Sequence, residues 1–154
     1  MPKHEAKEQV FLKCEADGML LPQKEINLGR INTVLAIADE DLKTIEELKD
    51  KNDRANTVYK LAYDVIHSLA EALLLFDKIK SMNHKCLFAY LCVKYEDLEL
   101  DFNFFEKIRT KRNGIHYYGS FTSINEWRSI ELQVMLYIKT LQKEILKKIE
   151  LSYR

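Results

Sequence analysis

The sequence contains few of the residues that interrupt helices. Only four glycines and two prolines occur among its 154 residues, and none of them lies between Arg30 and Asn113. Because glycine and proline are the strongest breakers of regular structure, their scarcity predicts long helices. No stretch sustains the alternation of apolar and polar residues that a half-buried strand requires. The pattern therefore favours an all-α fold.

Several functional classes also lack their usual signs. The longest apolar run, Cys86 to Val93, is too short to span a bilayer, and the charged N-terminus has no secretory apolar segment. We therefore expect a cytoplasmic protein without a membrane segment. The 24 basic and 24 acidic residues cancel, so global charge gives no argument for nucleic-acid binding. A glycine-rich phosphate loop, an HExxH motif and a nucleophile elbow are all missing, and we expect no cofactor.

The cysteines predict neither a disulfide framework nor a metal site. The chain has three of them, an odd number, at Cys14, Cys86 and Cys92, and they form no CxxC motif. The spacing of Cys86 and Cys92, even with His84 nearby, matches no common zinc pattern. We therefore expect three reduced, partly buried thiols and no bound metal.

Helical periodicity divides the chain into three long helices and several short ones. Apolar residues recur at intervals of three and four over about 28–50, 55–80 and 124–152. Shorter helices are predicted over 5–16, 84–93 and 99–112. Ser123 and Glu126 have the spacing of a capping box at the start of the last helix. The fold predicted is an antiparallel up-and-down bundle in a single domain over 1–154, with a core over about 28–152 and an N-terminal helical extension over 1–27.

One segment, KIRTKRNGIHYYG at 107–119, concentrates the unusual chemistry of the chain. Four cations precede an Asn-Gly pair, a histidine and two tyrosines. If the helix continues through this segment, Arg109, Arg112 and His116 share one face. If Gly114 ends the helix, His116 lies just beyond and can fold back over the last turn. Either arrangement places an imidazole near two guanidinium groups.

This combination of side chains suits metal-independent cleavage of RNA through its own 2′-hydroxyl. Histidine can move the proton, and arginine can stabilise phosphoryl oxygens. Asn113 is a candidate to position the ribose or the phosphate, and Tyr117 and Tyr118 are candidates to stack on bases. An ordinary helix end has the same ingredients, because cations in the last turn complement the helix dipole. Both interpretations stay open at this point.

Two carboxylates are candidates to support the arginines. Asp64 and Glu71 lie seven residues apart on the second long helix, which is expected to be the most buried of the long helices. Carboxylates in such a place are rarely left unpaired. They are expected to pair with Arg109 or Arg112, either to fix guanidinium orientation or as plain structural salt bridges.

Three segments, taken in order, resemble the signature segments of the HEPN family of prokaryotic helical proteins. They are ADEDLKTIEELKD, YKLAYDVIHSLAEALLLFDKIKSMNHKCLFAYL and RTKRNGIHYYG, and the resemblance covers about residues 31–150. It implies an antiparallel helical bundle, usually a homodimer. Many family members are metal-independent endoribonucleases, often toxins encoded beside a minimal nucleotidyltransferase antitoxin. Other members are inactive, which leaves a nucleotide-, RNA- or protein-binding module as the alternative.

The family motif is an arginine, commonly followed by a small polar residue, and then a histidine after four to six residues. By this resemblance Arg109 and His116 are the catalytic pair, with six residues between them. Arg112 and Asn113 supply the arginine-polar pair, but only three residues separate Arg112 from His116. In one branch of the family, the partner nucleotidyltransferase modifies a tyrosine two residues after the histidine. Tyr118 occupies that position.

Overall fold

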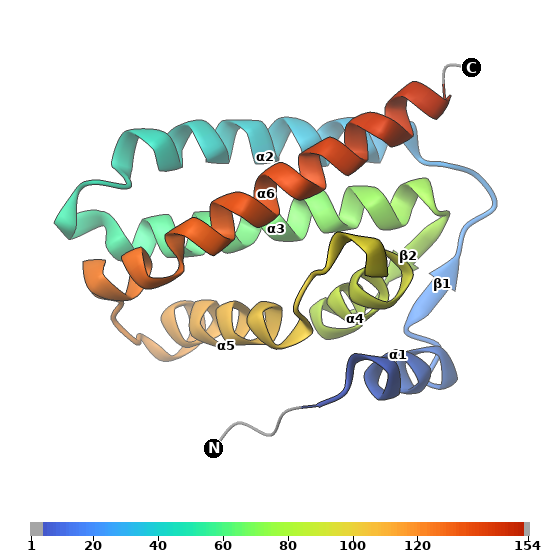
Figure 1. Ribbon diagram of the computed structural model, residues 1–154, viewed down its shortest axis with the longest axis horizontal. Coiled ribbons are helices and arrows are strands. Elements are labelled where there is room, and N and C mark those ends of the chain that lie inside the picture. Colours follow the sequence, from blue (N-terminus) through green and yellow to red (C-terminus); the bar gives the residue numbers. More distant parts are fainter. Residues whose placement is uncertain (1–4, 153–154) are drawn as a thin grey trace.

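The computed structural model describes residues 5–152, and most of them are helical. The α-helices are α1 (Lys7–Ala16), α2 (Leu28–Leu48), α3 (Ala55–Phe76), α4 (His84–Lys94), α5 (Phe102–Tyr118) and α6 (Ile124–Ser152) (Figure 1). Short 3₁₀ helices, η1 (Asn52–Arg54) and η2 (Glu96–Leu98), precede α3 and α5. The two strands, β1 (Leu20–Pro22) and β2 (Ile79–Ser81), are three residues each. The predicted all-α bundle is confirmed.

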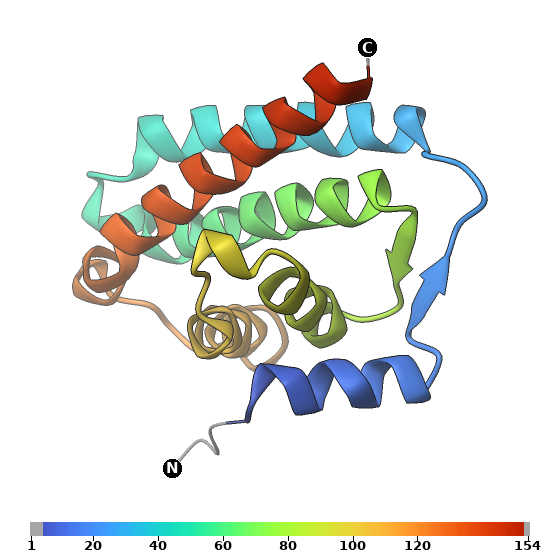
Figure 2. The ribbon, with the colours of Figure 1, turned by 45° about the vertical axis from the view of Figure 1, so that its right-hand side comes forward.

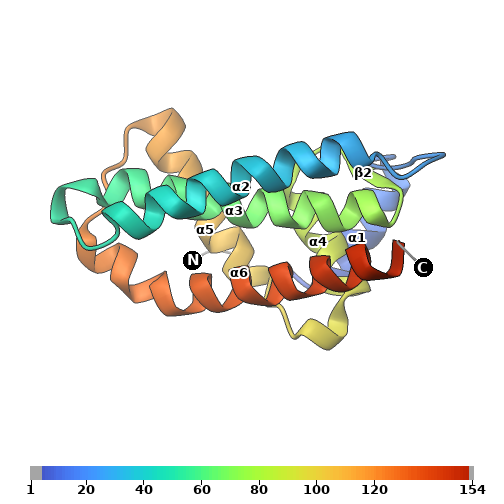
Figure 3. The same cartoon turned by 90° about the horizontal axis from the view of Figure 1, so that it is seen from above.

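The helix α3 lies at the centre of the bundle. It packs against α2 and α6 on one side and against α4 and α5 on the other (Figures 1 and 3). In Figure 1, α2 runs opposite to α3 and α6, which point the same way, and α5 crosses α3 at a steep angle (Figure 3). The helix α1 stands apart from the long helices and packs on α4 (Figure 2).

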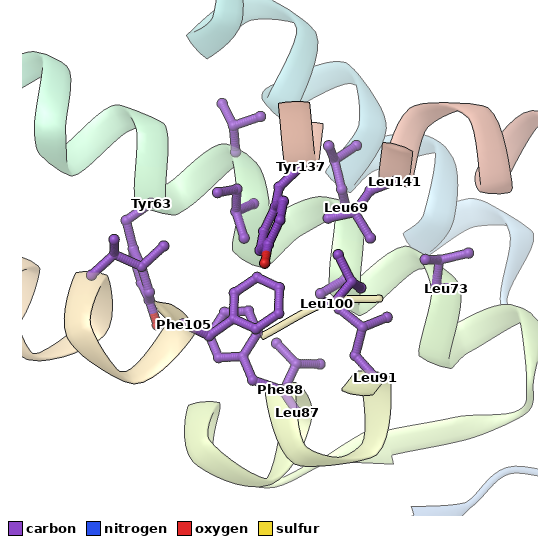
Figure 4. Close-up of a cluster of buried hydrophobic side chains, with 14 of the residues drawn as sticks. Tyr63, Leu69, Leu73, Leu87, Phe88, Leu91, Leu100, Phe105, Tyr137 and Leu141 are labelled. Carbon is purple, nitrogen blue, oxygen red and sulfur yellow. The ribbon is translucent and has the colours of Figure 1, made fainter. Parts of the chain in front are cut away.

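The core explains why α3 holds this position. Fourteen of its 22 residues are buried, against four of the 21 in α2, so α3 is the more deeply buried, as predicted. Aromatic rings join the surrounding helices: Phe88 of α4 stacks on Phe105 of α5 with ring centroids 4.6 Å apart, and Tyr137 of α6 lies 5.4 Å from Phe105 (Figure 4). Each such side chain contributes roughly 1.5–3 kcal/mol by leaving water. These contacts fix α4 and α5 against α3.

Side-chain caps define the helix starts that the sequence predicts. The amide of Glu126 donates to Ser123 Oγ at 3.2 Å, and the amide of Ser123 donates to Glu126 Oε1 at 3.3 Å. This reciprocal pair is the predicted capping box. At the start of α4, Asn83 Oδ1 accepts from the amide of Cys86 at 2.8 Å.

Two helix ends differ from the prediction. The helix α3 ends at Phe76 rather than near residue 80, because Lys78 adopts a φ of 59° and the chain enters β2. The strand β2 pairs antiparallel with β1, with Leu20 opposite Ser81. The helix α5 starts later than predicted because Glu99, with a φ of 54°, ends the preceding turn.

The helix α5 also continues six residues past the predicted end at 112, through Gly114 to Tyr118. The alternative in which Gly114 ends the helix is therefore wrong. An interior glycine costs only about 1 kcal/mol relative to alanine, and Ile115 packs on the core in the next position. Gly119, with a φ of 65°, ends the helix instead.

The cysteine prediction is wrong for two residues and correct for one. Cys14 and Cys86 form a disulfide that joins α1 to α4, whereas Cys92 is a free, buried thiol. The two bonded cysteines are 72 residues apart, and the pairing of β1 with β2 is what folds α1 back onto α4. Within residues 5–152, no helix combines the length and the apolar character needed to cross a bilayer.

Candidate functional site

One polar stripe runs along the buried central helix. Its members are Asn56, Lys60, Asp64, His67 and Glu71, and all five are partly buried. At 100° per residue, they lie within an arc of about 80° around the helix axis. We call these five residues the polar stripe of α3. Asn56 accepts from the amide of Thr122 in the connection between α5 and α6. Three other members meet partners on α5, α4 and α2, so the stripe is where the bundle brings polar side chains together.

Asp64 pairs with an arginine of α5. Arg112 Nη2 lies 3.4 Å from Asp64 Oδ1, and the guanidinium lies 5.7 Å from the centroid of the Tyr63 ring. Arg112 Nε is buried and has no hydrogen-bond partner in the part of the chain that the structure describes. The prediction that Asp64 pairs with one of the two arginines is confirmed. Glu71 pairs instead with Arg30 of α2, at 3.0 Å, so its predicted contact with Arg109 or Arg112 is wrong.

The continuous helix puts Arg109, Arg112 and His116 on one face of α5, within an arc of about 60° at 100° per residue. Their surroundings differ. Arg109 donates from Nε and Nη2 to the carboxylate of Glu106, one turn earlier, at 2.9 and 2.7 Å. His116 is exposed and lies edge-on to Tyr117, with ring centroids 4.7 Å apart. Arg112 is thus the arginine whose donors are less fully used.

Charges from α4 and α5 act on Asp64. Burial raises the pKa of Asp64 above its usual range, while Arg112, His84 and His116 act in the opposite direction. The pKa of Asp41 on α2 is also raised, first by burial and then by Asp64. Asp64 therefore holds a proton more readily than an exposed aspartate does, at a point between α2 and α5.

A histidine pair adjoins this ion pair, and sequence reasoning missed it. The Tyr63 hydroxyl lies 2.8 Å from His84 Nδ1, and the His84 and His67 ring centroids are 4.1 Å apart. Burial raises the pKa of Tyr63, so its hydroxyl keeps its proton at neutral pH. A neutral hydroxyl can donate to His84 Nδ1 or accept from it, and the tautomer of His84 sets the direction of this hydrogen bond. No signal in the sequence links Tyr63 with His84, because they are 21 residues apart on different helices.

Both imidazoles are kept neutral. Burial and Arg112 lower the pKa of His84. Burial and the neighbouring His84 lower the pKa of His67 to about 3. A hollow of about 230 Å³ opens beside the pair, between α3, β2 and the start of α4. Its lining includes Arg30, His67, Glu71, Leu74, Ser81 and His84. Among residues 5–152, no group of three or more His, Cys, Asp or Glu side chains is arranged to hold a metal ion.

The remaining predicted site residues lie at the far end of α5. Tyr117 and Tyr118 are 67% and 84% exposed, so both can meet a partner molecule. Tyr118 lines a broad groove with Lys107 and Lys111 on the face of α5 that is opposite to Arg112. Asn113 is half-buried and makes no side-chain hydrogen bond within the described residues. The structure therefore gathers Asp64, Arg112 and His116, and it places Tyr118 elsewhere.

No protein-family model, curated protein or solved structure matches this chain.

Proposed function

We propose that the protein is a metal-independent endoribonuclease of the HEPN type that works as a homodimer. The observation that carries this proposal is the state of Arg112. Its Nε is buried without a hydrogen-bond partner among residues 5–152, and only Nη2 reaches a carboxylate. A buried donor left unpaired costs about 1–3 kcal/mol. The Arg112 side chain is 17% exposed, so a phosphodiester oxygen can approach the outer nitrogens of its guanidinium and accept a strong, charge-assisted hydrogen bond there.

The geometry favours Arg112 over Arg109 as the phosphate-binding residue. The resemblance to the HEPN family assigns that role to Arg109 through its spacing to His116. Two nitrogens of Arg109 are already bound to Glu106, whereas Arg112 binds Asp64 through one nitrogen at a longer distance. Arg109 lies one turn away and supplies a second positive charge. In this assignment Asp64 is a positioning residue, because it orients Arg112 without touching the RNA.

His116 is the residue proposed to move the proton. One imidazole removes the proton of the ribose 2′-hydroxyl, and the 2′-oxygen forms a bond to phosphorus. The bond from phosphorus to the 5′-oxygen breaks, and a second imidazole protonates that leaving oxygen. The products are a 2′,3′-cyclic phosphate and a free 5′-hydroxyl. A homodimer provides both imidazoles, one from each protomer, and the arginines stabilise the charge on the phosphorane.

The test is RNA cleavage in the presence of a chelator. We expect the wild-type protein to release 2′,3′-cyclic phosphate ends, and His116→Ala and Arg112→Ala each to lower the rate by roughly 10²- to 10⁴-fold. Arg128→Ala, on the exposed surface of α6, is the matched control and should cleave as wild type does. Failure of the wild type to cut any RNA, or equal rates for all variants, contradicts the proposal.

A second candidate function is RNA or protein binding without cleavage. The observation that favours it is the neutralisation of both arginines, since Glu106 and Asp64 each hold one of them. RNA binding that weakens steeply with salt, with no product formed, would support this candidate. A stoichiometric protein complex without RNA affinity would instead indicate a pure interaction role.

The proposed partner is a nucleotidyltransferase antitoxin that modifies Tyr118. Its hydroxyl is accessible to another enzyme, because Tyr118 is 84% exposed, and Tyr117 packs against His116. Incubation with such an enzyme and a nucleoside triphosphate should add mass to the wild type and to Tyr117→Phe, but not to Tyr118→Phe. Light scattering of the purified protein tests the homodimer separately.

A further inference from the structure

The hollow beside the two histidines has both apolar and polar walls. Its volume of about 230 Å³ is below the range of sites for drug-sized molecules. Apolar side chains, among them Leu74 and Leu87, form part of its wall, and the rings of His67 and His84 form another part. Because the pKa of His67 is lowered to about 3, its ring is an uncharged aromatic surface at neutral pH. Such surfaces stack well on nucleobases.

The polar edge of the hollow has a defined pattern of donors and acceptors. Arg30 Nε and Nη2 lie 3.1 and 3.0 Å from the same oxygen of Glu71, Oε1. The other oxygen, Oε2, makes no hydrogen bond with any residue from 5 to 152. The pair is also accessible, because the side chains of Arg30 and Glu71 are 51% and 26% exposed. The edge thus presents a carboxylate with a free oxygen next to a guanidinium.

We propose that this hollow binds an unpaired guanine base of the RNA substrate. The pairing edge of guanine carries two adjacent N–H donors, at N1 and N2, and an acceptor at O6. Guanine replaces one of the two contacts between Arg30 and Glu71 Oε1: the two carboxylate oxygens of Glu71 accept from N1–H and N2–H, and the Arg30 nitrogen released from Oε1 donates to O6. Adenine and uracil each offer the carboxylate one donor. Cytosine also offers one donor, and like uracil it has a smaller ring.

The position of the hollow connects it to the phosphate-binding arginine. Asp64 and Glu71 are seven residues apart on α3, which places them roughly 10 Å apart along the helix axis. Tyr63 bridges the two regions, since it contacts Arg112 with its ring and His84 with its hydroxyl. A base in the hollow and a phosphodiester at Arg112 can therefore belong to adjoining nucleotides of one strand. In this respect the inference rests on the proposed ribonuclease function and names its base preference.

The binding test does not depend on cleavage. The four ribonucleoside monophosphates are titrated into the full-length protein while the ring signals of His67 and His84 are followed by NMR. We expect GMP to bind most tightly and to shift both histidines. Glu71→Gln should weaken GMP binding by roughly 10- to 100-fold, because one acceptor is replaced by a donor. Glu47→Gln, an exposed carboxylate near the opposite end of α2, is the control and should bind GMP as wild type does.

A cleavage test then separates this inference from the proposed function. An RNA with single unpaired G, C, A and U positions should be cut beside G by the wild type, and beside all four bases by Glu71→Gln. Selective GMP binding without cleavage supports the guanine site and contradicts the ribonuclease. Cleavage without base preference, or equal affinity of the four monophosphates, overturns the guanine site and leaves the ribonuclease standing. Unchanged GMP affinity in a folded Glu71→Gln protein overturns it as well.

Discussion

Loss of the Cys14–Cys86 disulfide should weaken the fold by up to about 4 kcal/mol. The bond joins residues that are 72 positions apart. In the chain-entropy description, a cross-link over a loop of this length removes about 4 kcal/mol of conformational freedom from the unfolded chain at 25 °C. The helix α1 buries only two apolar side chains besides Cys14, namely Val10 and Phe11. Their burial contributes roughly 3–6 kcal/mol together, which does not offset the ordering of ten residues at about 1–2 kcal/mol each.

The reduced protein should therefore lose α1 first. Urea unfolding with and without reductant measures the global effect, and amide exchange of α1 measures the local one. Under denaturing, non-reducing conditions a thiol reagent should label one cysteine, Cys92, and after reduction it should label all three. The double variant Cys14→Ala/Cys86→Ala should behave as the reduced protein does, and Cys92→Ala should keep the response to reductant.

Two results would refute this reasoning. Labelling of three thiols without reductant would show that the bond does not form. A loss of less than about 1 kcal/mol on reduction, with α1 amides still protected from exchange, would show that packing rather than the cross-link holds α1. Formation of the bond inside cells would also count against the predicted cytoplasmic location, because that compartment keeps most thiols reduced.

Three further predictions concern stability. Between pH 6.5 and 5 the unfolded chain protonates His67, whereas the folded chain does not, because its His67 pKa is about 3. The free energy of unfolding should therefore fall by about 2 kcal/mol more in the wild type than in His67→Phe over this range. Denaturant melts at both pH values measure the difference. Asp77 accepts from the hydroxyls of Tyr90 and Tyr95 at 3.0 and 2.8 Å. Asp77→Ala should therefore lower the free energy of unfolding, measured in a urea melt, by roughly 2–4 kcal/mol. The control variant Asp17→Ala, at an exposed position, should change this free energy by less than about 0.5 kcal/mol. Phe105→Ala should lower the free energy of unfolding by about 3–5 kcal/mol, because it opens a cavity beneath Phe88. Phe121→Ala, at an exposed position, should have little effect. If Phe105→Ala were as mild as Phe121→Ala in a urea melt, the core described above would be contradicted.

The sequence predicts the helices well because their signals are local. A helix without glycine or proline can be recognised from the spacing of its own apolar residues. The capping box of Ser123 and Glu126 can likewise be recognised from residues that are close in the sequence. The ends of α5 were predicted less well. Gly114 is a frequent helix stop, but tertiary packing of Ile115 overrides that propensity. The extension is what sets Arg112 and His116 on one helical face, so this local error affected the candidate site directly.

The parts of the site that could not be predicted depend on contacts between distant segments. Arg30 reaches Glu71 across 41 residues, and His84 reaches Tyr63 across 21. Periodicity indicates which face of a helix is buried, but not which neighbour covers it. The same two arginines, Arg109 and Arg112, were predicted as partners for both carboxylates of α3. This is correct for Asp64 and wrong for Glu71, whose partner Arg30 lies on α2.

The cost of the polar stripe of α3 is itself an argument for function. The ion pair of Asp64 with Arg112 is only partly buried, with side chains 38% and 17% exposed, and such a pair contributes little to stability, less than well-packed apolar residues would. The desolvated histidine pair beside it lowers stability as soon as the pH falls. A bundle selected for stability alone would continue the apolar pattern of α3 across this stripe. Instead, the central helix exchanges part of its core for an arginine with an unused donor, two neutral imidazoles and a carboxylate with a free oxygen. Local rules of folding are broken most often where a protein binds something, and here they are broken along a single line of side chains that joins the arginine to the hollow.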